Sequence, residues 1–340
     1  MADNSKMNIA GKRILLIALS GYSMGIVKQM QDMGAIVDYV NDKPNDGFIC
    51  KAMGRLQVGF YQKVLDKYYR DKIDALSDKN YDYILIIRGE YTPVNSLLRL
   101  REAFPNARLV LYMWDGMDTR GNKGISKKWK YFDKVLTFDR IDYQAHKDEI
   151  EFLPLYYYDA FLPKETKDPN ADDFTYDISF IGTGHKDRVR IVKDIMKQCE
   201  DNGKKTYSYV FMPFYLIFLL NKITNRDFKG VKRSEISFKK LPFEFLYSTY
   251  ADSRCVVDVE HPGQHGLTMR SIEIIGLKRK FITTNKDIVN YDFYNKNNIL
   301  VVDRKNPVVD MSFFDTPYEE LPAEMYEKYS LSSWIINVLS

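Results

Sequence analysis

The stretch Cys255–Glu273, with the sequence CVVDVEHPGQHGLTMRSIE, decides the fold that we expect for this chain. Its apolar start, Cys255–Val259, is typical of a buried strand, and its end has the pattern of a helix. A polar turn that contains glycine joins the two, so the turn lies at the carboxyl end of a strand. In open α/β sheets, ligands bind at such strand ends. The start of the following helix offers unpaired N–H groups and a positive dipole end, which suit a phosphate group.

Two charged residues on the predicted helix favour the same interpretation. Arg270 and Glu273 are three positions apart, so they share one face of the helix. Arginine can pair with a diphosphate, and glutamate can accept hydrogen bonds from ribose hydroxyl groups. The sequence therefore indicates a nucleotide-sugar site. The alternative is an ordinary surface ion pair at the start of a helix.

Short apolar runs alternate with helix-length amphipathic segments, which favours parallel sheets with crossover helices. At 340 residues the chain is long enough for two domains. We expect an α/β protein with two doubly wound Rossmann-like domains that face each other across a cleft. The predicted domains are 1–155 and 174–320, the proline-containing segment 152–173 links them, and the helical segment 321–340 could return to the first domain.

Composition places limits on the function. Fifty basic and 46 acidic residues leave a net charge of +4, which is too small to indicate nucleic acid as a partner. Hydrophobic residues make up 45% of the chain, as in a globular protein, and no run reaches the roughly 18 apolar residues of a membrane span. Cys50, Cys199 and Cys255 show no CxxC spacing, so we expect buried, reduced thiols in a cytosolic protein.

The most apolar stretch of the chain begins at Val210, and basic residues follow it up to Arg233. One interpretation of 210–233 is a buried strand followed by a helix in the core. The other is a segment that lies in a membrane interface, with its basic residues on anionic lipid headgroups.

A second glycine-containing turn follows the first predicted strand of the second domain, in the stretch Phe180–Arg188. Gly182 and Gly184 would let the backbone approach a phosphate, and Lys186 and Arg188 would add positive charge. The alternative is a plain tight turn between a strand and a helix. His261 and His265 have no cysteine or carboxylate at metal-ligand spacing, so we expect no metal site there.

In the first domain, acidic residues follow two neighbouring predicted strands. An acid at such a position can act as general base for an acceptor hydroxyl. Asp115 is the first candidate for this catalytic role, and Asp118 and Glu90 are the others. Capping of a helix by Asp115 or Asp118 is the structural alternative. The residues predicted to border the acceptor are Ser20, Gly21 and Trp114.

With these residues in view, the chain resembles the GT-B glycosyltransferases. The pattern Gln264-x-Gly266-Leu267-Thr268-Met269-Arg270-x-x-Glu273 is similar to their second domain, as are the segments 280–285 (KFITTN) and 291–294 (YDFY). The likeness is to enzymes encoded in bacterial capsule and lipopolysaccharide clusters and to the CgeB-like group, which Tyr112-x-Trp114-Asp115 also fits.

The resemblance implies that the second domain holds the sugar donor and the first domain the acceptor, without a bound metal or a further cofactor. It places Glu273 on the ribose and Arg270 near the diphosphate. The predicted donor-binding residues are Gly182, Gly184, Lys186, Arg188, Gln264, His265, Gly266, Thr268, Arg270, Glu273 and Asn285. Many retaining GT-B enzymes carry Glu-x7-Glu, but the first of these positions is His265 here. The resemblance therefore decides neither retention nor inversion.

The sequence thus predicts a metal-independent glycosyltransferase of the hexosyltransferase type that uses a nucleotide-sugar, with a UDP-sugar as the expected donor. The expected acceptor is a glycan or lipid-linked glycan of a bacterial capsule, lipopolysaccharide or exopolysaccharide. If the enzyme inverts, Asp115 would deprotonate the acceptor. Two alternatives stay open: a sugar-nucleotide epimerase of the same architecture, and a non-catalytic protein that binds a nucleotide ligand. The expected location is the cytoplasm, with peripheral contact to the inner face of the membrane.

Overall fold

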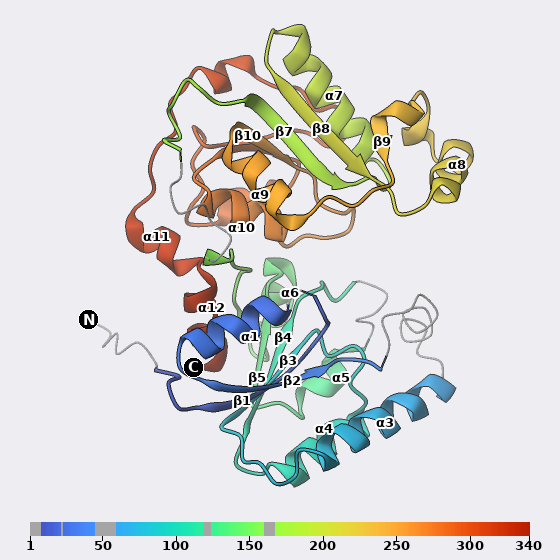
Figure 1. The fold of residues 1–340 in the computed structure, drawn as a ribbon, viewed down its shortest axis with the longest axis vertical. Coiled ribbons are helices and arrows are strands. Elements are labelled where there is room, and N and C mark those ends of the chain that lie inside the picture. Colours follow the sequence, from blue (N-terminus) through green and yellow to red (C-terminus); the bar gives the residue numbers. More distant parts are fainter. Residues whose placement is uncertain (1–7, 22, 45–58, 119–123, 160–166) are drawn as a thin grey trace. The chain divides into compact units, whose positions relative to one another are not determined.

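The structure is a computed structural model, which describes residues 8–21, 23–44, 59–118, 124–159 and 167–340 (Figure 1). The chain forms two compact units. The first unit comprises Met1–Leu155, Gly263–Gly266 and Leu331–Ser340, and the second comprises Tyr156–Pro262 and Leu267–Ser330. Within the described residues, each unit contains a six-stranded sheet whose strands all pair in parallel. The predicted pair of doubly wound α/β domains is therefore confirmed.

The sheet of the first unit has the strand order β2-β1-β3-β4-β5-β6. Its strands are β1 (Arg13–Ala18), β2 (Ile36–Asn41), β3 (Tyr83–Ile87), β4 (Arg108–Met113), β5 (Lys134–Thr137) and β6 (Glu151–Phe152). The central strands are apolar at nearly every position and buried on both faces, as parallel strands covered by helices must be. The helices are α1 (Ser23–Asp32), α3 (Gly59–Asp74), α4 (Val94–Ala103), α5 (Ser126–Trp129), α6 (Arg140–Ala145) and α12 (Leu331–Leu339).

The last helix, α12, packs into the first unit. The ring of Trp334 is buried and stands edge-on to Tyr112 of β4, with 4.8 Å between the ring centroids. The amide of Gln29 on α1 donates to the hydroxyl of Ser332, at 2.9 Å. The ammonium of Lys134 donates to the carbonyl of Asn337, at 3.0 Å. The end of the chain thus completes the core around the beginning of the chain.

The sheet of the second unit has the strand order β12-β11-β10-β7-β8-β9. Its strands are β7 (Tyr176–Thr183), β8 (Thr206–Phe211), β9 (Ile236–Ser237), β10 (Ser253–Asp258), β11 (Lys280–Thr283) and β12 (Ile299–Val301). The α-helices are α7 (Arg188–Asp201), α8 (Tyr215–Thr224), α9 (Phe243–Ala251), α10 (Met269–Gly276) and α11 (Ala323–Lys328). The 3-10 helices are η2 (Arg226–Phe228), η3 (Arg233–Glu235), η4 (Lys286–Asn290) and η5 (Met311–Phe314).

Two predicted helices differ from those observed. The pattern of Pro307–Phe313 predicts a helix, but the structure has only the short η5 there, which Asp310 starts by accepting a hydrogen bond from the Ser312 N–H. The helix expected at Leu321–Leu339 is divided into α11 and α12, because Ser330 forms a parallel bridge to Tyr157. The strands β6 and β9 are two residues long, too short for their periodicity to be visible in the sequence.

The apolar stretch that begins at Val210 ends strand β8 and then forms α8. Phe218 is the buried residue of α8, and most of its other side chains are exposed. The interpretation of this helix as part of the core is therefore wrong. No helix in the described part of the chain is long and apolar enough to cross a membrane. Cys199 and Cys255 are free and buried, and Cys50 lies outside the described residues.

Candidate functional site

The two sides of the second sheet separate between β7 and β10. From β7 the chain runs to β8 and β9 on one side, and β10, β11 and β12 lie on the other side. At such a switch point, the crossover helices of the two neighbouring strands lead away in opposite directions. The loops at the carboxyl ends of these strands are then the usual place for a ligand in an open α/β sheet. The two turns singled out from the sequence follow β7 and β10.

Packing explains the two glycines of the turn after β7. A Cβ atom on Gly182 would lie 2.7 Å from the Phe180 ring, and one on Gly184 would lie 2.6 Å from Val210. Both glycines are therefore required by their protein neighbours. Their role in letting the backbone approach a phosphate stays a prediction. The left-handed residue of this turn is instead Lys186, whose φ is 47°.

Arg188 is the first residue of α7, and its guanidinium lies at the switch point. One of its terminal nitrogens donates to the carbonyl of Thr183, at 3.1 Å. Its Nε is enclosed and has no hydrogen-bond partner among the described residues, and no described carboxylate lies within ion-pair distance. Burial, and then the like charge of Arg270, lower the pKa of Arg188 to about 10. An anion beside Arg188 would relieve both effects.

Arg270 and Glu273 lie on one side of α10 and are largely buried. Arg270 donates to the carbonyl of Ile181 at 2.8 Å and lies 3.4 Å from Oδ1 of Asp258. Burial raises the pKa of Glu273, although a hydrogen bond from Tyr247 and the charge of Arg270 act against this rise. The alternative of an ordinary surface pair is therefore wrong, because both side chains are enclosed at the strand ends.

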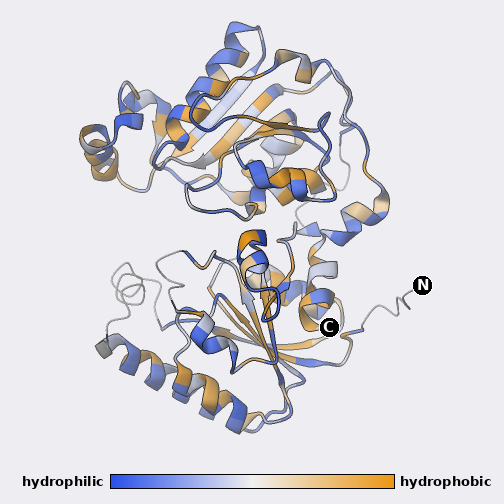
Figure 2. Cartoon of the chain, turned by 180° about the vertical axis from the view of Figure 1, so that it is seen from behind, coloured by the Kyte–Doolittle hydropathy of each residue, from blue (hydrophilic) through white to orange (hydrophobic). Residues whose placement is uncertain are grey.

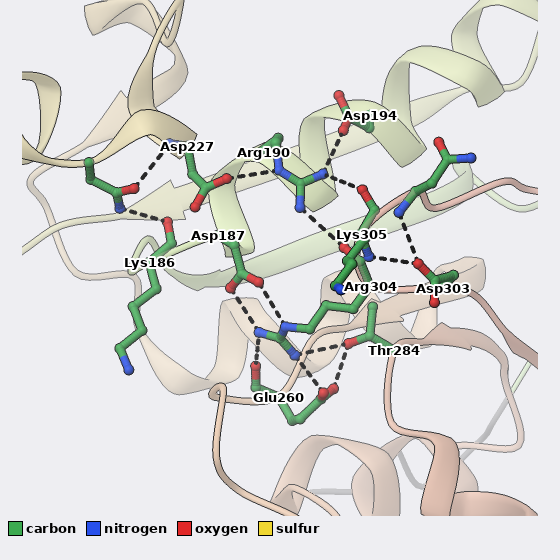
Figure 3. A network of polar contacts seen from close by, with 12 residues as sticks. Lys186, Asp187, Arg190, Asp194, Asp227, Glu260, Thr284, Asp303, Arg304 and Lys305 are labelled. Carbon is green, nitrogen blue, oxygen red and sulfur yellow. Dashed lines mark hydrogen bonds and ion pairs between the residues drawn. The ribbon is translucent and has the colours of Figure 1, made fainter.

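Arg304, which the sequence analysis did not single out, joins the loops that follow four strands (Figure 3). Its guanidinium binds both carboxylate oxygens of Asp187, at 2.7 and 2.8 Å, and it also contacts the carboxylate of Glu260. The carboxylate of Glu260 accepts a hydrogen bond from Thr284. These residues follow β7, β10, β11 and β12, so one side chain fixes the carboxyl edge of most of the sheet.

This network also affects the start of α7. Asp187 is the N-cap residue of α7, but its side chain makes no capping hydrogen bond. Its carboxylate is taken up by Arg304 instead (Figure 3). The first-turn N–H groups of α7 therefore receive no carboxylate from their own cap, which favours an external anion at this helix end. Lys186 extends its side chain away from the network in the same view.

Two histidines border Arg188. The rings of His185 and His261 have their centroids 5.0 Å apart, and Nδ1 of His185 is buried without a partner among the described residues. Burial, and then the charge of Arg188, lower the pKa of His185 to about 3. The ring is therefore neutral at neutral pH. Its Nδ1 can then either donate or accept one hydrogen bond, depending on the tautomer.

The other predicted donor-binding residues have contacts of their own. Thr268 is the N-cap of α10, where its hydroxyl accepts from the Ser271 N–H and donates to Asp258. Asn285 caps η4. Gln264, His265 and Gly266 belong to the first unit, where the Gly266 N–H donates to Asp139 at 2.9 Å. Their role in donor binding stays a prediction.

The first unit has its own switch point, between β1 and β3. Arg88 follows β3 with a left-handed φ of 76° and pairs with both Glu90 and Asp115, at 2.7 and 2.9 Å. The ammonium of Lys128 supports this turn by donating to the carbonyls of Gly89, Glu90 and Thr92. Two of the three predicted catalytic acids are therefore brought together by one arginine.

The third acid, Asp118, is exposed. Its negative charge interacts with the carboxyl group of Asp142 and helps to raise the pKa of that group. Burial is the largest cause of that rise, which brings the pKa of Asp142 to about 6. Neither Asp115 nor Asp118 is the N-cap of a described helix; Ile125 and Asp139 hold those positions in α5 and α6. Neither acid thus caps a helix of the described residues, and residues 119–123, which follow Asp118, lie outside them.

The predicted acceptor residues lie at the ends of β1 and β4. Ser20 is exposed, and its N–H donates to the side chain of Asn41. Gly21 has a φ of 101°, a conformation that a residue with a side chain rarely adopts. Trp114 is half-buried and stands edge-on to Tyr112.

A buried ion pair between Asp42 and Lys43, at 3.1 Å, lies after β2 and was not foreseen from the sequence.

The described residues contain no evident metal centre. Among the described residues, no group of three His, Cys, Asp or Glu side chains is placed to hold a metal ion. The charged groups at the switch point of the second unit are instead three guanidinium groups and the carboxylates that pair with two of them. The guanidinium groups belong to Arg188, Arg270 and Arg304.

Comparisons with known proteins agree on the fold. No family model matches the chain, and no curated protein matches it in sequence. One similar solved structure is an alpha-glucosyltransferase in complex with UDP and DNA, with a TM-score of 0.58, 15% identity and coverage of 97% of this chain and 96% of that one. Another is the lipopolysaccharide outer core galactosyltransferase WaaB, with a TM-score of 0.53, 11% identity and coverage of 96% and 99%.

A third similar structure is a UDP-N-acetylglucosamine 2-epimerase, with a TM-score of 0.52, 8% identity and coverage of 97% of this chain and 94% of that one. At identities this low, the likeness concerns the fold. The chain therefore has the two Rossmann-like domains of the GT-B fold, which glycosyltransferases and an epimerase share among these neighbours.

Replacing Arg304 by glutamine should destabilise the second unit by about 3 kcal/mol, because Asp187 and Glu260 would be left without their cation. Chemical denaturation measures this change. The matched control is Lys197→Gln, which removes an exposed ion pair to Asp201 and should cost less than about 1 kcal/mol. Equal losses in the two variants would contradict the role assigned to Arg304.

The ring of His185 should stay neutral down to about pH 4, because its pKa is about 3 in the folded chain. Folding therefore disfavours its protonation, so this group contributes stability above about pH 6.5 that is lost as the pH falls towards 3. NMR of the imidazole signals, assigned with a His185→Gln variant, measures the titration. The urea-unfolded chain is the control. A midpoint near 6.5 in the folded chain would show that the ring is not buried as described.

Proposed function

We propose that this chain is a metal-independent glycosyltransferase that moves a sugar from a nucleotide-sugar, a UDP-sugar by preference, to a bacterial surface glycan or lipid-linked glycan. The single observation that carries the proposal is the enclosed guanidinium of Arg188, which has no described carboxylate within ion-pair distance at the switch point of the second unit. Arg188 has an enclosed Nε without a partner, and Arg270 and the start of α7 lie close to it. A diphosphate would satisfy all three.

The proposed roles follow from the contacts of each residue. Arg188 and Arg270 hold the diphosphate and stabilise the negative charge that develops on it when the sugar leaves. Glu273, buried beside Arg270 on α10, accepts hydrogen bonds from the ribose. His185, neutral and with a partnerless Nδ1, makes one hydrogen bond to the donor. This division of roles uses the protein's own cations in place of a metal ion.

In the first unit, we propose that Asp115 is the general base for the acceptor hydroxyl, provided that the reaction inverts. Its carboxylate is partly exposed and held by Nε of Arg88 at 2.9 Å, so its orientation is fixed while one side stays accessible. Glu90 is bound to the same guanidinium but is buried, which favours a supporting role for this second acid. Capsule, lipopolysaccharide and exopolysaccharide are the acceptor classes that the sequence resemblance suggests.

An epimerase is the second candidate, because one of the structural neighbours is a UDP-N-acetylglucosamine 2-epimerase with the same two-domain fold. The two reactions differ in what they need. An epimerase interconverts free sugar nucleotides, whereas a transferase needs an acceptor or releases the sugar to water. Incubating the chain with nucleotide-sugars in the absence of acceptor, and separating the products, distinguishes them.

Nucleotide binding should depend on Arg188. UDP at a hundred times its dissociation constant stabilises the folded chain by about 2.7 kcal/mol and so raises its Tm. The Arg188→Gln variant should lose most of this rise, because the substitution removes the enclosed cation. A thermal-shift panel of UDP, GDP, CMP and dTDP measures it, with the exposed Arg99→Gln in the first unit as the control. The proposal fails if no nucleotide raises the Tm, or if Arg188→Gln responds like the control.

Transfer should depend on Asp115 without loss of donor binding. The Asp115→Asn variant should keep the rise in Tm with UDP and lower the rate of sugar transfer by roughly 10²- to 10⁴-fold, the usual contribution of a general base. Radiolabelled sugar transfer measures the rate, and Asp32→Asn, in an exposed pair with Lys28, is the control. If Asp118→Asn abolished transfer while Asp115→Asn did not, the base would have to be reassigned to Asp118.

A further inference from the structure

Helix α8 carries an unusual amount of exposed apolar surface for a helix at the edge of a sheet. Leu216, Leu220 and Ile223 are exposed by 76%, 58% and 84%. They are four and three positions apart, so they form one stripe along the helix. Phe214, at the start of the helix, is also exposed. Figure 2 shows this helix, the α8 of Figure 1, coloured largely as hydrophobic. Contiguous apolar surface of this kind marks an interaction site.

The helix is fixed to the second unit by its inner side. Phe218 is buried, and its ring lies 6.3 Å from that of Phe238. The guanidinium of Arg233 lies over the Phe238 ring, 4.3 Å from its centroid. The outer stripe therefore takes no part in holding α8 in place, and it is available to a partner.

Basic residues lie within and directly after the helix that carries the stripe. Residues 214–242 contain seven basic and two acidic side chains, a net charge of +5, whereas the whole chain has a net charge of +4. The two acids, Asp227 and Glu235, are bound to Arg190 and Lys193. The basic residues nearest to the stripe are Lys222, Arg226, Lys229, Lys232 and Arg233, and all are exposed. The segment 214–242 thus combines a net charge of +5 with a helix whose apolar side chains are exposed.

We propose that α8 and the basic residues up to Lys240 form a surface that docks on an anionic lipid bilayer. We call this the α8 surface. The stripe of Leu216, Leu220 and Ile223 enters the boundary between headgroups and acyl chains, and the surrounding cations bind the anionic headgroups. The proposal goes beyond sugar transfer, because docking needs no reaction.

Charge distinguishes a bilayer from other partners. A symmetric contact between two copies of the α8 surface would bring its cations against themselves, and like charges across an interface cost binding energy. Lysine is also depleted at protein–protein interfaces, whereas a polybasic segment beside an apolar helix is favoured at a bilayer with anionic lipid. The observed combination therefore fits a lipid surface best.

The α8 surface is also joined to the proposed donor site. The side-chain amide of Asn225, which follows α8, donates to the carbonyl of Lys186 at 3.2 Å. The carboxylate of Asp227 accepts from Nε of Arg190 on α7, at 2.9 Å (Figure 3). Docking of α8 would therefore hold the turn after β7 near the lipid headgroups.

Vesicle co-sedimentation of the full chain tests the proposal. The protein should sediment with vesicles of phosphatidylcholine and phosphatidylglycerol and not with phosphatidylcholine alone, and salt should weaken binding because it screens the headgroup charge. The variant Leu216→Ser/Leu220→Ser/Ile223→Ser should lose binding by on the order of tenfold or more, since its apolar stripe is gone. Val289→Ser/Val308→Ser, at exposed apolar positions elsewhere in the second unit, should bind like the unmodified chain.

A second pair of variants tests the charge. Lys229→Gln/Lys232→Gln should weaken binding by on the order of tenfold, whereas Lys63→Gln/Lys147→Gln removes two exposed charges from the first unit and should leave binding unchanged. The proposal is overturned if the unmodified chain ignores anionic vesicles, or if the stripe variant still binds them. It is also overturned if sedimentation without lipid shows a dimer that the stripe variant dissociates. Each variant should keep its thermal response to UDP, so failure of docking and failure of donor binding are separable.

Discussion

The parallel pairing of β7 with β10 is the constraint on which the proposed donor site depends. These strands come from different parts of the second unit's chain, and the sheet grows away from them on both sides. The turns that follow them are therefore neighbours at one edge, although about 80 residues separate them in the sequence. The residues assigned to the diphosphate and the ribose are placed by this pairing, and the pairings of β11 and β12 add Thr284 and Arg304 to the same edge.

The charges at the two switch points differ in a way that the fold alone does not require. In the second unit, Arg304 takes up Asp187 and Glu260, and Asp258 pairs with Arg270, so Arg188 keeps a positive charge without a carboxylate. In the first unit, one arginine, Arg88, is shared between Glu90 and Asp115. The two sheets, whose strand orders differ, thus carry an arginine without a carboxylate in one unit and arginine-bound acids in the other. This difference is what a donor site and an acceptor site would need.

Much of the fold was predictable because each strand carries its own signal. The runs Tyr83–Ile87 and Arg108–Met113 are apolar on both faces and are bounded by polar turns, a pattern that predicts buried strands, and they form β3 and β4 with these bounds. Short strands such as β9 and the break between α11 and α12 depend on pairing with distant residues, which periodicity does not contain. The helical nature of 215–224 was open to prediction, but its exposure was not, because an apolar helix without polar periodicity is usually buried.

The sequence by itself determined two doubly wound domains, the turns after β7 and β10, and the shared face of Arg270 and Glu273, because these depend on local periodicity and spacing. The tertiary structure decided which charges meet. Arg304 lies more than 100 residues from Asp187, and no local pattern predicts that their side chains pair. It also decided that Gly182 and Gly184 serve packing, that Gln264–Gly266 belong with the first unit, and that α8 stays uncovered. Each of these depends on contacts between distant segments, which are fixed only when the sheets assemble.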